Sequence, residues 1–266
     1  MPTQRLTELP DNVRRLIEKT TGSPVVDIAM ISAGLNSAIA ARVETAHRTM
    51  FVKGLPLNHP RVWTQTREAQ ISPHVLGIAP RLLWHYEADG WSLLAFEYLQ
   101  GHHADYTPAS ADLPAVMASM VQLSHIPAPA AHLKTMSHRL RGYVDDPADL
   151  AWFAGNHLLH TEWNPHNVLV TGHHARLVDW GWASTGALWI DPALWLLWLI
   201  AHGHTCQQAE QAAAAHPAWQ QAPAEGLDAL ARAQQRLWHS IAAQSPDDWA
   251  KPMHEAATAW EAHRRH

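Results

Sequence analysis

The sequence predicts an α+β protein in which a strand-rich N-terminal third precedes a longer, mainly helical part. Up to about Leu99, short β-leaning runs alternate with turn residues. After Gly101, helical stretches interrupted by proline take over, and the chain from Asp191 onward is helical and alanine-rich. One hairpin, centred on Gly172, is the only strand signal in that second part. The division predicts an N-terminal part over residues 1–100 and a C-terminal part over residues 101–266.

The N-terminal part is predicted to be a small antiparallel sheet with two helices. Apolar positions at helical spacing indicate a helix over residues 5–20, which Gly22, Ser23 and Pro24 stop. A second helix is expected over residues 60–75, a polar stretch with Trp63, Ala69 and Ile71 and no internal glycine. The sequence Glu87-Ala88-Asp89-Gly90 predicts a hairpin turn. The predicted strands are residues 25–31, 38–44, 49–53, 82–86 and 91–99.

The C-terminal part is predicted to be helical around one short hairpin. Helical stretches are expected over residues 113–124 and 132–142, and again from Asp191 to the end of the chain. The runs 168–170 and 176–178 flank turn residues 171–174 and predict the hairpin.

Composition excludes several classes of partner. The chain of 266 residues has 19 Lys and Arg against 24 Asp and Glu, with no clustered basic tract, so we expect no nucleic-acid partner. The longest apolar stretch, residues 193–201, is too short to span a bilayer, so no membrane partner is expected. A single cysteine, Cys206, and the lack of an apolar leader predict a cytoplasmic protein. The 21 histidines show no structural-zinc spacing.

The most specific pattern lies at residues 158–170 and 177–181, which read LLHTEWNPHNVLV and LVDWG. It resembles the catalytic and metal-binding segments of the aminoglycoside phosphotransferase and choline kinase family. That family's pattern is His-x-Asp-x-x-x-x-Asn, then a hairpin, an apolar pair and Asp. His160, Glu162, Asn167 and Asp179 occupy those positions in order. Independently of the resemblance, the predicted hairpin returns Asn167 and Asp179 to the same end of two paired strands.

The resemblance implies a two-lobed protein-kinase-like fold and an ATP-dependent phosphotransferase. Such an enzyme would bind ATP (or GTP) and Mg²⁺ and transfer the γ-phosphate to a hydroxyl of a small molecule. By the resemblance, Glu162 is the catalytic carboxylate and His160 braces the catalytic loop. Asn167 and Asp179 would hold Mg²⁺, and Asp191 would support the loop.

The resemblance also assigns the N-terminal part, residues 1–100, as the nucleotide-binding lobe. Lys53 closes an apolar strand and would bind the α- and β-phosphates, with Glu68 on the following helix as its partner. The C-terminal part, residues 101–266, would carry the catalytic loop and the acceptor. The other residues expected to contact nucleotide are Ser32, Gly34, Asn36 and Ser37, in a strand-turn-strand segment, and Glu97 and Tyr98, in the hinge between the lobes.

Two departures from the family pattern leave alternatives open. Glu162 stands where the family has aspartate, and Thr161 stands where it often has glycine. Glutamate keeps the basicity of aspartate, but its extra methylene shifts the carboxylate by about 1 Å, which can cost about a hundredfold in rate. The alternative is therefore a nucleotide-binding pseudokinase with weak or no transfer activity. A serine hydrolase is excluded because no Gly-x-Ser-x-Gly elbow occurs.

The acceptor is not specified by the sequence, because specificity in such a fold resides in the helical lobe and its loops. An aminoglycoside-like antibiotic and other hydroxyl-bearing metabolites both remain candidates.

Overall fold

The computed structural model describes residues 6–31, 37–245 and 248–265, and the chain divides into two compact units. The N-terminal unit comprises Met1–Gly101 together with Leu177–Trp182, and the C-terminal unit comprises His102–Arg176 and Ala183–His266. The predicted mixed α+β class is confirmed, with an antiparallel sheet in the first unit and mainly helices in the second. Within the described ranges, no helix is long and apolar enough to cross a membrane.

A five-stranded antiparallel sheet forms the centre of the N-terminal unit, in the order β1-β2-β3-β5-β4. Its strands are β1 (Val25–Met30), β2 (Ile39–Thr45), β3 (Thr49–Pro56), β4 (Leu82–Ala88) and β5 (Trp91–Glu97). The predicted turn between β4 and β5 contains Asp89 and Gly90 at φ 51° and 83°. Two successive positive φ angles match the right-handed twist of the flanking strands, which explains the Asp-Gly pair.

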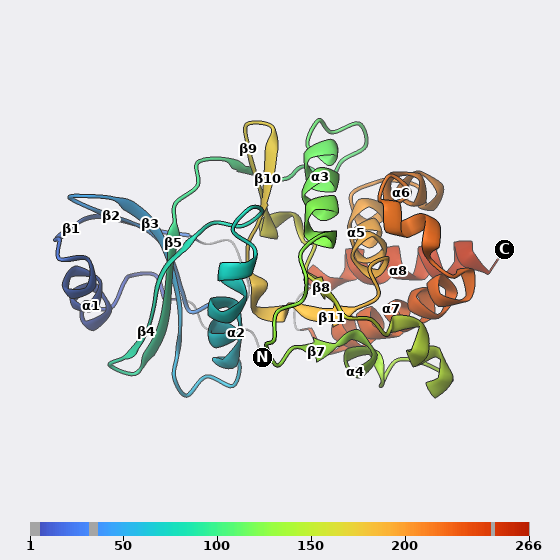
Figure 1. Ribbon diagram of the computed structural model, residues 1–266, viewed down its shortest axis with the longest axis horizontal. Helices are drawn as coiled ribbons and strands as arrows, with labels where there is room; N and C mark the ends of the chain where they lie inside the picture. The colour runs from blue at the N-terminus through green and yellow to red at the C-terminus, as the bar shows by residue number, and fades with distance from the viewer. Residues whose placement is uncertain (1–5, 32–36, 246–247, 266) are drawn as a thin grey trace. The chain divides into compact units, whose positions relative to one another are not determined.

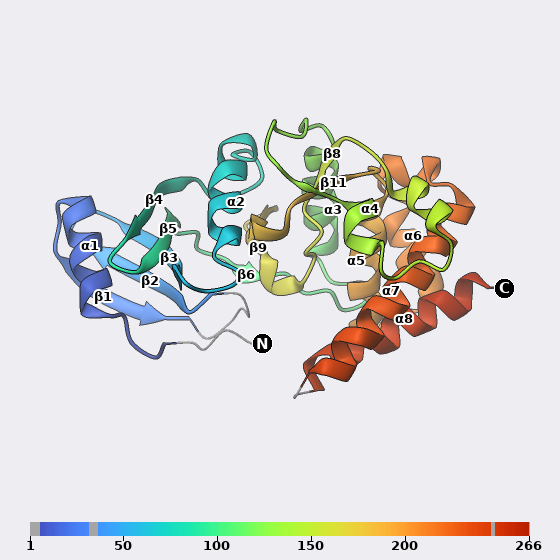
Figure 2. The same ribbon diagram turned by 90° about the horizontal axis from the view of Figure 1, so that it is seen from below.

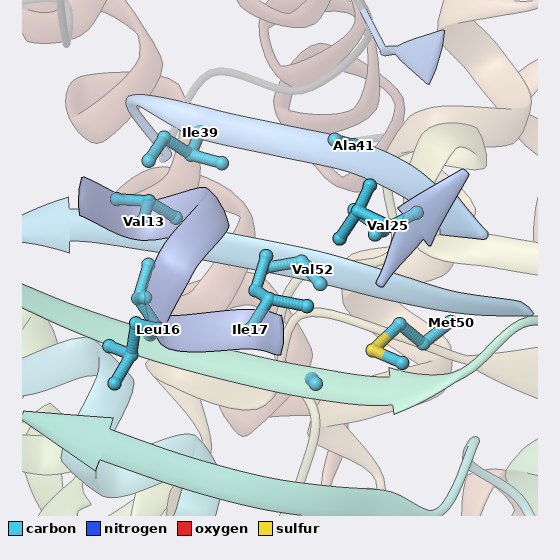
Figure 3. Packing of buried hydrophobic residues seen from close by; sticks show 11 residues of the cluster. Val13, Leu16, Ile17, Val25, Ile39, Ala41, Met50 and Val52 are labelled. Carbon is cyan, nitrogen blue, oxygen red and sulfur yellow. The ribbon is translucent and has the colours of Figure 1, made fainter. Parts of the chain in front are cut away.

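Two helices cover opposite faces of this sheet (Figures 1 and 2). On one face, Val13, Leu16 and Ile17 of α1 (Asp11–Thr21) pack onto apolar side chains of the strands, including Ile39 and Val52 (Figure 3). Because successive strand residues point to opposite faces, Lys53 of β3 points away from this core. It faces α2 (Trp63–Ile71), which continues as the 3₁₀ turn η1 (Ser72–His74).

Two small sheets frame the C-terminal unit. β6 (His102–His103) pairs with β9 (Val168–Thr171), and β10 (His174–Leu177) lies on the other side of β9, so the predicted hairpin is present. In the other sheet, β11 (Ser184–Gly186) lies between β7 (Lys134–Thr135), to which it is parallel, and β8 (His157–Leu159).

Helices make up most of the remaining C-terminal unit. α5 (Ile190–Ala201) is buried along most of its length, as its nearly unbroken apolar sequence requires. Trp195 of α5 and Trp260 of α8 (Lys251–Arg264) are among the largest fully buried side chains, so these tryptophans serve core packing. The other helices of this unit are α3 (Leu113–Ser124), α4 (Met136–Leu140), α6 (Cys206–Ala213) and α7 (Ala224–Gln244), with 3₁₀ segments η2 (Pro147–Phe153), η3 (Pro165–Asn167), η5 (Pro217–Gln221) and η6 (Asp248–Ala250). The 3₁₀ segment η4 (Trp180–Trp182) belongs to the N-terminal unit.

The sequence-based element boundaries were wrong in several places. β3 continues past Lys53 to Pro56, so Lys53 lies within the strand and does not close it, and β5 ends at Glu97. The first helix begins at Asp11, after Pro10, and the second becomes a 3₁₀ turn at Ser72, next to Pro73. The stretch 132–142 is not one helix, because Lys134–Thr135 pairs with β11 and the Thr135 side chain then caps α4. The short strands β6, β7, β8 and β11 were not predicted, since two- and three-residue strands carry no period that a sequence could display.

Candidate active site

Lys53 is held between two carboxylates in the N-terminal unit. Its Nζ lies 2.5 Å from Glu68 Oε2 and 3.0 Å from Asp179 Oδ1. Lys53 is 6% exposed and Glu68 is 3% exposed, whereas lysine and glutamate are almost never this buried unless paired. The predicted partnership of strand lysine and helix glutamate is therefore present in the structure. Asp179, 126 residues along the chain from Lys53, completes the cluster.

The charges of this cluster depend on one another. Burial opposes the Lys53 ammonium, but the Asp179 and Glu68 carboxylates outweigh it and raise the pKa of Lys53 above its ordinary value. Burial raises the pKa of the Glu68 carboxyl, although the Lys53 charge acts in the opposite direction. A cation that stays charged in a dry environment is suited to binding an anion such as a phosphate.

The chain near Asp179 is shaped by a close approach to α2. A Cβ atom on Gly181 would lie 2.8 Å from Thr64 Cβ, so only glycine lets η4 pack this tightly on the helix. Trp182 also meets Trp63 edge to face, with ring centroids 5.1 Å apart. Asp179 has φ 64°, in the left-handed region that non-glycine residues seldom adopt. Such backbone outliers cluster at functional sites.

The predicted catalytic loop lies in the C-terminal unit, after β8, and Asp191 of α5 holds its backbone. The Asp191 carboxylate accepts hydrogen bonds from the backbone N–H groups of His160 and Thr161, both at 2.9 Å. Burial raises the pKa of Asp191 to about 6, so at neutral pH the carboxyl is mostly ionised and can accept both bonds. The His160 ring is fully buried, and its Nδ1 accepts from the Glu162 backbone N–H at 3.3 Å. The sequence had assigned these supporting roles to Asp191 and His160 by resemblance.

Thr161 is a second strained residue. Its φ is 67°, and a β-branched residue in the left-handed region is a genuine outlier. The sequence held an indication of this positive φ, because the family that the sequence resembles often has glycine at this position. The structure shows how threonine is retained: Asp191 binds its backbone, and Arg139 Nη1 donates to its Oγ1 at 2.6 Å.

Glu162 and Asn167 are neighbours within the same loop. Asn167 Nδ2 donates to the Glu162 carbonyl oxygen at 3.1 Å, which fixes the orientation of the amide. The Glu162 side chain is 33% exposed, and its Oε1 lies 3.5 Å from Arg139 Nη2. The Glu162 carboxylate is therefore partly accessible from solvent and lies beside the Arg139 guanidinium.

The expected magnesium ligands have the right chemistry for a hard cation. Asn167 uses its amide nitrogen in the bond to Glu162, so the amide oxygen is the atom it would offer, and Asp179 offers a carboxylate. Among the described residues, no group of three or more His, Cys, Asp or Glu side chains could hold a metal ion. Mg²⁺ is commonly held by one or two protein oxygen ligands together with substrate phosphates and water, so each of these oxygen atoms has the chemistry of a Mg²⁺ ligand.

The remaining predicted nucleotide contacts lie at the ends of strands of the N-terminal sheet or outside the described residues. Ser32, Gly34 and Asn36 are outside the described ranges, and Ser37 lies just before β2. Glu97 ends β5, and its backbone and side chain both bond Arg81. Tyr98 follows it and is exposed.

Arg139 is the residue of this region that the sequence analysis missed. It lies on the five-residue helix α4 and contacts Thr161, Glu162 and Ser184. No motif marks it, since it is 22 positions from Thr161 along the chain.

Solved structures of small-molecule kinases share this fold. The choline kinase LicA from Streptococcus pneumoniae superposes with a TM-score of 0.66 at 13% identity, covering 95% of this chain and 100% of that one. An aminoglycoside phosphotransferase from Alicyclobacillus acidocaldarius gives a TM-score of 0.64 at 13% identity, covering 98% and 97%. The aminoglycoside phosphotransferase APH(4)-Ia gives 0.62 at 16% identity, covering 95% and 97%. No family model matches the sequence, and no curated protein matches it.

The similarity extends over nearly the whole chain and establishes the kinase-like fold. The predicted two-lobed architecture, with an antiparallel sheet lobe and a mainly helical lobe, is thereby confirmed. At 13–16% identity, the similarity to these structures supports the fold and not the activity. The chemistry has to be argued from the side chains described above.

Proposed function

We propose that the protein is an ATP-dependent phosphotransferase that transfers the γ-phosphate of ATP to a hydroxyl of a small molecule. The buried Lys53, paired with Glu68 and Asp179 within a kinase-like fold, is the observation that carries this proposal. Burying one ammonium and two carboxylates costs several kcal/mol per ion unless they pair well. A structural role would be met as well by apolar residues of similar volume, whereas a phosphate site needs the charge.

Each residue of the N-terminal cluster then has a distinct task. Lys53 binds the α- and β-phosphates, and Glu68 fixes the ammonium in place. Asp179, together with Asn167 of the catalytic loop, supplies oxygen ligands to Mg²⁺. The bound Mg²⁺ would neutralise charge on the β- and γ-phosphates.

In the catalytic loop, Glu162 is the proposed general base. Its carboxylate accepts or orients the proton of the acceptor hydroxyl as the oxygen attacks the γ-phosphorus, while the bond from the γ-phosphorus to the bridging β-phosphate oxygen breaks and ADP leaves. His160 and Asp191 keep the loop backbone in place through the hydrogen bonds at Glu162, His160 and Thr161. Glu162 thus takes part in the transfer itself, whereas the buried His160 and Asp191 only orient the loop that carries it.

An adenine nucleotide is the favoured phosphate donor. The structures of similar fold include LicA in complex with AMP and APH(4)-Ia in ternary complexes with ADP or AMP-PNP and hygromycin B. LicA and APH(4)-Ia bind these adenine nucleotides, which are therefore the first nucleotides to test with this protein. GTP, which the sequence left open, is included as a comparison.

The acceptor is proposed to be a small hydroxyl-bearing molecule. Choline and hygromycin B, taken from the names of the similar structures, are the first two probes. Amino sugars and other metabolic alcohols complete the panel.

The single cysteine, Cys206, supports a proposed cytoplasmic location.

The second candidate is a nucleotide-binding pseudokinase. Glu162 in place of aspartate and the strained Thr161 favour it, because either could misplace the carboxylate. The retained cluster of Lys53, Glu68 and Asp179 argues for transfer, since a protein freed from phosphoryl transfer would not need it. Turnover separates the two candidates, whereas nucleotide binding does not.

Mg²⁺–ATP is expected to stabilise the folded protein. At about 100 times its Kd, a ligand adds about 2.7 kcal/mol to the free energy of unfolding, which corresponds to a rise in Tm of about 5–10 °C for a chain of this size. Thermal unfolding with ATP, ADP, AMP-PNP or GTP, with Mg²⁺ and with EDTA, measures the effect. If no nucleotide moves Tm under any of these conditions, both the kinase and the pseudokinase proposals are wrong.

Asp179→Asn is expected to weaken the Mg²⁺-dependent part of nucleotide binding while the protein stays folded. A neutral amide is a poorer ligand for a hard cation, so the difference in Tm between ATP with Mg²⁺ and ATP with EDTA should shrink. Circular dichroism checks folding in parallel. An unaltered difference would remove Asp179 from the proposed metal site, and global unfolding would assign it a structural role.

A further inference from the structure

We propose that Arg139 is a positioning residue, which holds Thr161 in its left-handed conformation and the Glu162 carboxylate in place for the transfer. The part that concerns Thr161 stands on geometry alone. The part that concerns turnover rests on the proposed function.

The guanidinium of Arg139 connects three segments of the C-terminal unit. Its Nη1 donates to Thr161 Oγ1 at 2.6 Å and to Ser184 Oγ at 3.1 Å. Its Nη2 lies 3.5 Å from Glu162 Oε1. Arg139 comes from α4, Ser184 from β11, and the other two residues from the loop after β8, so one side chain ties the loop to both neighbours.

The segment that carries Arg139 is anchored by backbone pairing and by a helix cap. β7, which directly precedes α4, pairs with β11 through Lys134 and Ser184, and Ser184 is fully buried. The Thr135 side chain caps α4 by accepting from the His138 N–H at 3.1 Å. The Arg139 side chain is 21% exposed, so much of the guanidinium contact is shielded from water. Contacts of this kind are screened less than exposed ion pairs.

Thr161 requires such support. A β-branched residue with φ 67° persists only where its surroundings over-determine the conformation. Asp191 fixes the backbone N–H, and Arg139 fixes the hydroxyl, so two independent bonds hold one residue. The conformation of Thr161 in turn sets the direction in which the chain enters Glu162.

Glu162 benefits from the same guanidinium. Glutamate has one more rotatable bond than aspartate, so its carboxylate would otherwise sample more positions. The planar, five-donor guanidinium can serve Thr161, Ser184 and Glu162 together, which the compact ammonium of lysine cannot do. Thr161 and Glu162, the two residues that depart from the family pattern, are thus both held by Arg139.

A stability cycle tests the Thr161 contact without any assay of activity. Arg139→Met and Thr161→Val are each expected to lower Tm, and the double variant should lower it by clearly less than the two losses added. Thr161→Ser keeps the hydroxyl, so Arg139→Met should cost as much in that background as in the wild type. Arg141→Met, at the C-cap of the same helix but exposed, removes the same charge and should leave Tm nearly unchanged. Additive losses would overturn the proposed contact; if Arg139→Met does not fold, Arg139→Lys replaces it in the cycle.

Phosphate release from Mg²⁺–ATP, with water as the acceptor, tests the effect on Glu162. Arg139→Met is expected to lower kcat by about 10- to 100-fold, as for a misplacement of about 1 Å, while KM for ATP changes less than about twofold. Arg139→Lys should fall between Arg139→Met and the wild type, and Arg141→Met should match the wild type. An unchanged kcat in Arg139→Met overturns the positioning role. If the wild type releases no phosphate to water, the same variants are compared with an acceptor from the panel. If no acceptor supports transfer, the proposed function is wrong, and the stability cycle decides whether Arg139 holds Thr161.

Discussion

Replacing Lys53 with methionine is expected to lower the free energy of unfolding by about 3–5 kcal/mol and to abolish the stabilisation by Mg²⁺–ATP. Methionine fills a similar volume but leaves the Glu68 and Asp179 carboxylates buried without the cation they both contact. At about 2–4 °C per kcal/mol, the loss corresponds to a fall in Tm of about 6–20 °C. Thermal unfolding with and without Mg²⁺–ATP measures both effects.

A double variant separates stability from function at this position. In Lys53→Met/Glu68→Leu the buried pair is replaced by apolar side chains, a change that is often neutral or stabilising. Part of the lost Tm should therefore return, because only Asp179 then lacks its cation, while the response to Mg²⁺–ATP should stay absent. Lys19→Met is the matched control, since Lys19 is exposed on α1. A wild-type nucleotide response in the double variant would mean that Lys53 does not contact phosphate.

The fold could be predicted because most of its strands and turns are encoded by residues that are neighbours in the sequence. The five strands of the N-terminal sheet appear as β-leaning runs between turn residues, and the Asp89-Gly90 pair marks a hairpin whose φ angles suit those residues. The boundary within residues 132–142 failed because the deciding interaction is non-local. β7 exists because Lys134 and Thr135 pair with β11, about 50 residues away, and no periodicity within residues 132–142 reflects that pairing.

The candidate site was predictable where residue type and spacing encode the chemistry. Lys53 lies in contact with Glu68, the partner that the resemblance implied. Asp191, which the resemblance gave as a support of the loop, accepts a hydrogen bond from the His160 backbone N–H. The contact of Lys53 with Asp179 was not foreseen, because the sequence analysis treated the lysine and the metal ligands separately. Arg139 carries no motif at all. Its importance follows from a strained Thr161 and from distances, which only coordinates reveal.

Glu162→Gln is expected to lower phosphate transfer by about 10²–10⁴-fold while leaving the Mg²⁺–ATP-induced rise in Tm unchanged. The amide keeps the shape of the side chain but cannot accept the proton of the acceptor hydroxyl. Transfer to a confirmed acceptor from the panel, or phosphate release to water, provides the rate. Wild-type turnover in Glu162→Gln would exclude this carboxylate as the base.

Glu162→Asp tests whether the loop has adapted to the longer side chain. Aspartate has nearly the same basicity, with an ordinary pKa of about 3.9 against about 4.3, so a change in rate would report position. Because Arg139 Nη2 lies 3.5 Å from the glutamate carboxylate, the shorter side chain would withdraw from that contact. We therefore expect turnover to fall by about 10- to 100-fold, with KM for ATP little changed. Faster turnover in Glu162→Asp would contradict an adapted loop and would indicate that Glu162 slows an otherwise intact kinase site.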